Sequence, residues 1–67
     1  MDDKTAFELI GQTVSLIIDG RREDDVFVKG NNISTSHPTT LDLVLRTPIG
    51  APDRRIRVPL SRVELAP

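Results

Sequence analysis

Alternation of apolar and polar positions in the first half of the chain predicts two paired β-strands. Residues 13–18 place valine, leucine and isoleucine on one face, and an Asp-Gly pair follows as a turn signal. Residues 21–25 are charged and form a loop or the start of a second strand, which continues through the apolar run 26–28. Residues 30–40, rich in Asn, Ser, Thr and Pro, then form a loop.

The second half of the chain contains three further predicted strands. Leucines alternate with other residues at 41–46, and residues 47–53 form a loop because they hold two prolines and a glycine. Residues 54–58 form the fourth strand, ended by a proline that has no N–H to donate. One tight turn leads to a fifth short strand at 63–65.

The N-terminal residues predict a helix of one or two turns over 4–10. Asp2 or Asp3 can cap its start, and Gly11 is placed to end it. A helix this short is marginal alone and needs to dock on the strands. The apolar residues available for docking are Phe7, Leu9 and Ile10.

Together these elements predict an all-β fold: a small five-stranded barrel, closed or nearly closed, with a short N-terminal helix. The chain is expected to be a single domain, 1–67, with the helix in 1–11 and the barrel in 12–66. The inward-facing positions predict a nearly all-aliphatic core of Val14, Leu16, Ile18, Val26, Val28, Leu41, Leu43, Leu45, Ile56, Val58, Leu60, Val63 and Leu65.

Composition narrows the range of functions. A chain of 67 residues buries only about 60% of its unfolded surface, so the core is small. It has no cysteine to support it with disulfides or thiolate metal sites. No apolar run reaches the roughly 18–20 residues that span a bilayer, and the acidic N-terminus is unlike a signal peptide. A cytoplasmic location without membrane contact is the expectation.

Charge is nearly balanced overall but uneven along the chain. The net charge of -1 creates no global field for nucleic acid or acidic membranes. Residues 1–33 hold seven acids and four bases, for -3, and residues 34–67 hold three acids and five bases, for +2. Two differently charged faces would result if the fold keeps the halves apart.

The order of elements resembles the Sm-like and Src-homology-3-like small barrels. The stretches IGQTVSLIIDGRR, LDLVLRT and RRIRVPLSRVELA carry the resemblance. The nearest pattern is the C-terminal barrel of bacterial ribosome maturation factors, with a looser similarity to the Rho-inhibitor family and Hfq-type RNA chaperones. The resemblance implies a strand, one 3₁₀ turn and a closing strand at the end of the chain, and it implies RNA or ribosome association.

Two departures from that family pattern concern specific positions. These barrels usually bend the second strand around a glycine, whereas this chain has Asp24 and Asp25 there. The His or Lys residues with which Hfq-like rings hold RNA are not matched near Val58 to Arg62.

Catalytic and metal-binding patterns are weak. His37 is the only histidine and stands among hydroxyl residues of the 30–40 loop, but a nucleophile–base pair also needs an orienting acid, an oxyanion site and a pocket. The triplet Glu23, Asp24 and Asp25 lacks the spacing and central glycine of a calcium loop. We therefore expect no enzyme activity, no metal, no cofactor and no small-molecule substrate.

The arginines of the C-terminal segment are the best polar candidates for binding. Arg55 and Arg57 share one face of a strand, where guanidinium groups can hold phosphates or a partner's carboxylates. They can equally pair with acids on neighbouring strands, such as Asp42 or Glu64. The full candidate set is Arg54, Arg55, Arg57 and Arg62. The absence of tyrosine and tryptophan counts against base stacking.

Three apolar residues fall out of phase with the core positions of their strands: Ile17, Phe27 and Val44. Either the helix covers them or they form a surface that binds a partner. The leading hypothesis is a non-enzymatic, bacterial or phage-type cytoplasmic adaptor or regulatory module that binds another protein or itself. The alternative is an Sm-like RNA-binding or ribosome-associated module that uses the arginines.

Overall fold

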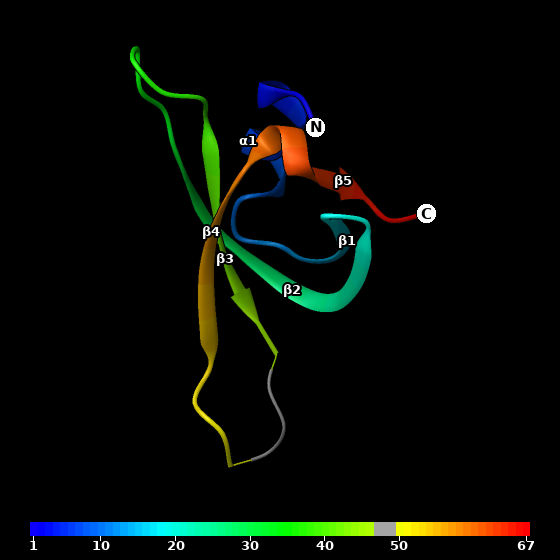
Figure 1. The fold of residues 1–67 in the computed structure, drawn as a ribbon. Coiled ribbons are helices and arrows are strands. Elements are labelled where there is room, and N and C mark those ends of the chain that lie inside the picture. Colours follow the sequence, from blue (N-terminus) through cyan, green and yellow to red (C-terminus); the bar gives the residue numbers. More distant parts are fainter. Residues whose placement is uncertain (47–49) are drawn as a thin grey trace.

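One antiparallel sheet of five strands and one short helix make up the protein in a computed structural model that describes residues 1–46 and 50–67 (Figure 1). The elements in chain order are α1 (Asp3–Leu9), β1 (Thr13–Ile18), β2 (Arg21–Asn32), β3 (Thr40–Leu45), β4 (Arg54–Pro59), the 3₁₀ helix η1 (Leu60–Arg62) and β5 (Val63–Leu65). The predicted all-β fold with five strands and an N-terminal helix is confirmed. Of the predicted loop 47–53, residues 47–49 lie outside the described residues.

The sheet does not close into a barrel. Its strand order is β4-β3-β2-β1-β5, so β4 and β5 stand at opposite ends and do not pair within the described residues. The helix η1 carries the chain from one end strand to the other, and β5 has only three residues with which to pair on β1 (Figure 1). Of the two expected forms, closed or nearly closed, the fully closed barrel is not found in the described part of the chain, because the three-residue β5 pairs with β1 alone and η1 separates it from β4.

Strand β2 includes the charged residues 21–25, extends past the predicted apolar run 26–28 into the start of the predicted loop 30–40, and bends sharply (Figure 1). Its first part pairs with β1 and its second part with β3, and the register shifts once against each partner. Between the pairs Val14↔Val26 and Leu16↔Glu23, β2 has one residue more than β1. Between Val28 and Gly30, β2 again has one more residue than β3. Each extra residue is a β-bulge, which bends the strand and increases its twist.

The first bulge is made by aspartates instead of glycine. Asp25 has a φ of 56°, in the left-handed region that Asp and Asn enter more readily than most residues. Side chains hold both bulge residues in place, since Ser15 donates to Asp24 at 2.7 Å and Arg46 pairs with Asp25 at 3.1 Å. Strand β2 thus bends at Asp24 and Asp25 without a glycine.

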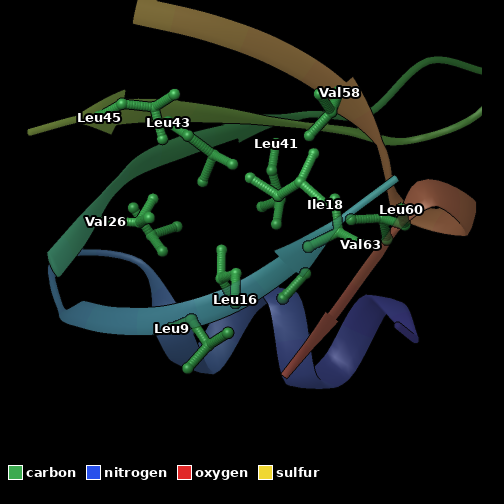
Figure 2. Packing of buried hydrophobic residues seen from close by; sticks show 12 residues of the cluster. Leu9, Leu16, Ile18, Val26, Leu41, Leu43, Leu45, Val58, Leu60 and Val63 are labelled. Carbon is green, nitrogen blue, oxygen red and sulfur yellow. The ribbon is translucent and has the colours of Figure 1, made fainter. Parts of the chain in front are cut away.

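The bent sheet wraps around one aliphatic core. Leucines of β3 face Leu16 of β1 and Val26 of β2, with Leu9 of α1 next to Leu16 (Figure 2). Most predicted core positions are confirmed as buried, while Val14 and Ile56 are only partly buried. Leu65 is 47% exposed, contrary to expectation, because β5 lies at an edge of the sheet.

The helix begins and ends close to the predicted positions. The Asp2 carboxylate accepts a hydrogen bond from the Thr5 N–H at 2.8 Å, which caps the helix start. Of the three residues predicted as alternatives for docking, Leu9 is buried together with Ala6, and Ile10 packs partly buried against the core, whereas Phe7 is 69% exposed. Side chains three positions apart share a helix face, and the face of Ala6 and Leu9 is the one turned to the core.

The bulge residue Asp25 provides a test of how β2 bends. We expect Asp25→Ala to be about 1–2 kcal/mol less stable than Asp25→Asn, because alanine is strained at positive φ and asparagine is not. Both variants lose the exposed ion pair with Arg46, so their comparison isolates the backbone effect. Urea unfolding measures the difference, and equal midpoints for the two variants would contradict it.

Candidate interaction surfaces

Phe27 and Val44 form an apolar pair on the outer face of the sheet. They are directly opposite each other in the register of β2 and β3, and Phe27 is 40% exposed. A shallow groove of about 260 Å³ lies against them, and charged residues rim it: Asp25, Arg46 and Asp53. The helix packs on the core through Ala6 and Leu9, and none of its residues lines this groove. We call these two residues the Phe27–Val44 patch.

Ile17 lies away from this patch. On β1, the residue opposite Phe27 is Thr13, four positions or roughly 13 Å along the strand from Ile17. Ile17 is half-buried between Arg22 and Glu64, its neighbours on β2 and β5. The structure therefore brings together two of the three apolar residues predicted as a partner surface and places the third elsewhere.

The four candidate arginines are all exposed. Three of them lie on the two faces of β4, and Arg62 lies in η1. Arg55 is opposite Val44 and Arg57 is opposite Asp42, so both are on the outer face of β4, as predicted. Arg54 is opposite the buried Leu45 and therefore lies on the inner face, at the end of the core.

Two of these arginines are engaged by carboxylates. Arg57 Nε donates to Asp42 Oδ1 at 2.8 Å across β3 and β4, one of the cross-strand pairs expected from the sequence. Arg62 of η1 donates two hydrogen bonds to Asp19 in the β1–β2 turn, a contact that was not predicted from the sequence. Arg54 and Arg55 form no ion pair with any carboxylate of the described residues.

A second groove, of about 530 Å³, runs along the open side of the sheet between β4 and the β1–β2 hairpin. Its walls bring together three of the four candidate arginines with one from the hairpin: Arg21, Arg54, Arg57 and Arg62. The acids Asp19 and Glu23 also line it. We call it the seam groove, because it lies where the sheet fails to close.

Sequence reasoning missed Arg21 and Glu23 as groove residues. They are opposite Ile18 and Leu16, so they lie on the inner face together with the core. Counting back from Val26 in steps of two would assign them to the outer face, but the bulge at 24–25 reverses the phase. A signal that could have found them was the Asp24-Asp25 pair, since aspartate enters the left-handed region of a bulge more readily than most residues.

The turn between β1 and β2 is tied to η1 by both main chain and side chain. The Asp19 N–H donates to the Arg62 carbonyl at 2.9 Å, and the Arg62 guanidinium holds the Asp19 carboxylate. The hydrogen bonds from Arg62 lower the pKa of Asp19 below its ordinary value, and the same contact raises the pKa of Arg62. This link sets one end wall of the seam groove.

The remaining polar candidates do not gather into a site. His37 is exposed in the β2–β3 loop, where Ser34 Oγ accepts a hydrogen bond from the Ser36 N–H as part of the loop's own structure. Asp24 and Asp25 are engaged by Ser15, Arg22 and Arg46 at the bulge. Within residues 1–46 and 50–67, no three His, Cys, Asp or Glu side chains are grouped to hold a metal ion.

No helix among the described residues is long and apolar enough to cross a membrane. A scan against protein-family models found no match, and searches of the curated proteins and of the solved structures also found no similar protein.

The carboxylates at the first hairpin predict a loss of stability in acid. The pKa of Asp19 is lowered by Arg62, and the pKa of Asp24 is lowered by Ser15 and then Arg22, from an ordinary value of 3.8. The unfolded chain therefore takes up protons first as pH falls. Stability gained from these groups is present above about pH 4 and is lost progressively below it.

Variants of the Asp19–Arg62 pair test this pH dependence. Asp19→Asn and Arg62→Gln should each show a smaller loss of unfolding free energy between pH 7 and pH 3 than the wild type. Asn is a conservative replacement because Asp19 has a φ of 53°. Urea unfolding at several pH values gives the comparison, and unchanged profiles in both variants would contradict the assignment.

Proposed function

We propose that this protein is a non-enzymatic adaptor or regulatory module that acts by contact with another protein or with a second copy of itself. The observation that carries the proposal is the Phe27–Val44 patch, an exposed aromatic and an aliphatic residue side by side within a rim of charge. An apolar centre with a polar rim is the usual anatomy of a protein interface. A cytoplasmic setting of bacterial or phage type is part of the proposal.

The two ends of the sheet support the same proposal. The outer edges of β4 and β5 have no strand partner among the described residues, and β4 carries six residues along such an edge. An unpaired edge can accept an extended segment through main-chain hydrogen bonds. Exposed side chains on the edge strands, including Arg55 and Glu64, would restrict which segments fit.

A second candidate is an RNA-binding or ribosome-associated module of the Sm-like type. The order of a short helix, a bent second strand and a 3₁₀ turn before the last strand supports the proposed resemblance to Sm-like and Src-homology-3-like barrels. The gathering of arginines at the seam groove favours an anionic ligand. Against RNA stand the engagement of Arg57 and Arg62 by carboxylates and the absence of tyrosine and tryptophan.

The patch predicts that a charge at its centre abolishes association without unfolding the protein. Phe27→Asp and Val44→Asp should each reduce self-association or partner capture by at least about tenfold, since a buried interface cannot hold an unpaired carboxylate. Light scattering measures the assembly mass, and pull-down followed by identification of the captured protein measures partner binding.

Ile33→Asp is the matched control for these variants. Ile33 is 75% exposed in the β2–β3 loop and lines none of the grooves described above. The Ile33→Asp variant also replaces an apolar side chain by a carboxylate, but outside the Phe27–Val44 patch, so association should persist. A strictly monomeric wild type that captures no partner, or equal loss in all three variants, would count against the adaptor proposal.

The RNA-binding candidate predicts a different response. Binding through phosphates should weaken steeply with added salt, and Arg55→Ala and Arg57→Ala should each reduce the slope of log affinity against log salt by about one unit. Fluorescence anisotropy with single-stranded RNA over a range of salt concentrations measures the slope. No binding at low salt would remove this candidate.

A further inference from the structure

The seam groove combines an aliphatic floor with a charged inner face. Its floor consists of core residues left partly uncovered where the sheet fails to close: Ile18, Leu45, Ile56 and Val58. Its volume of about 530 Å³ lies within the range of pockets that hold ligands. The floor offers apolar contact to an occupant, and the arginines above it offer hydrogen bonds in a fixed planar geometry.

The charge of the groove is not balanced within the described residues. Arg57 and Arg62 are engaged by Asp42 and Asp19. Arg21 and Arg54 lie on the inner face and form no ion pair with a described carboxylate. Among the described residues that line the groove, Glu23 is the one acid that is not paired with an arginine. The inner face therefore has a local excess of positive charge, which an anionic group of a ligand can neutralise. The same inward-pointing charges discourage unspecific pairing at the open edge.

The groove follows the free edge of β4. Its lining includes Ile56 and Val58 from the inner face of that strand and Arg57 from the outer face, so the groove extends over the edge between the faces. The main-chain groups along this edge have no strand partner in the described part of the chain. An extended segment placed here would meet free hydrogen-bonding groups, apolar side chains and guanidinium groups at once.

We propose that the seam groove binds an extended acidic segment of a partner protein, which adds along the edge of β4. Its side chains at every second position face the groove, where carboxylates pair with Arg21 and Arg54 and aliphatic groups rest on the groove floor. This inference rests on the proposed function and names the class of partner for a surface other than the Phe27–Val44 patch. Peptide is favoured over RNA because no aromatic side chain lines the groove and its floor is aliphatic.

A designed peptide tests the inference directly. The probe is fluorescein-labelled GETVTETVTG, which places Glu and Val on one face and Thr on the other, and its control is the same peptide with every Glu replaced by Gln. The folded protein should bind the acidic peptide at least about tenfold more tightly than the control, as measured by fluorescence anisotropy at low and moderate salt. Two further peptides carry N-methyl groups at alternate residues, one in each of the two possible phases, and one of the two should lose binding because strand addition needs the N–H groups along one edge.

Substitutions in the protein localise the contact. Arg21→Gln and Arg54→Gln should each weaken binding of the acidic peptide about tenfold, and Glu23→Gln should strengthen it by removing the opposing charge. Arg55→Gln is the matched control, because Arg55 adjoins Arg54 on β4 and forms no ion pair with a described carboxylate, but is opposite Val44 on the outer face and does not line the groove. Its loss removes the same charge and should leave affinity within about twofold.

Several outcomes would overturn the inference. Equal weakening by Arg55→Gln would mean unspecific attraction, and tighter binding of single-stranded RNA at the same arginines would assign the groove to nucleic acid. A dimer that blocks the peptide would assign it to a second copy of the chain. Capture of a partner that depends on Phe27 but not on Arg21 or Arg54 would leave the proposed function standing and remove the groove inference alone.

Discussion

Strand β2 leaves the first hairpin paired with β1 and reaches the second loop paired with β3. It changes partner by means of two bulges, one at residues 24–25 and one at Lys29. A straight sheet of this length could not surround its own apolar face, whereas a strand bent twice brings β1 and β3 to opposite sides of one core (Figure 2). The whole aliphatic cluster depends on this bend, which Ser15, Arg22 and Arg46 hold through the bulge aspartates.

The short last strand decides where the sheet stops closing. A chain of 67 residues supplies only a small core, and β5 is a three-residue segment that pairs only with β1. The inner face therefore continues past the core into positions occupied by Arg21, Glu23 and Arg54, which need water or a charged partner. The sheet thus stays open at the seam because the last strand is too short to close it. The charged residues at the seam discourage unspecific pairing with the strands of other molecules.

The two candidate surfaces use opposite faces of the same strands and differ in their physical character. The Phe27–Val44 patch offers apolar area, which supplies affinity with little dependence on salt. The seam groove offers arginines over an aliphatic floor, which favours negative charge in a partner. An adaptor with both surfaces could bind two different partners at once, because a residue on one face of a strand does not obstruct the other face.

Local signals in the sequence were enough to determine most of the elements. The alternation at 13–18 and 63–65, the Asp-Gly turn, the capping aspartate and the single turn after Pro59 are all found as predicted, since each depends on residues adjacent in the chain. Only the tertiary structure decided which side of β2 faces the core, because one bulge residue reverses the alternation for everything before it. It also separated Ile17 from Phe27 and exposed Phe7 and Leu65, since burial depends on neighbours that are distant in sequence.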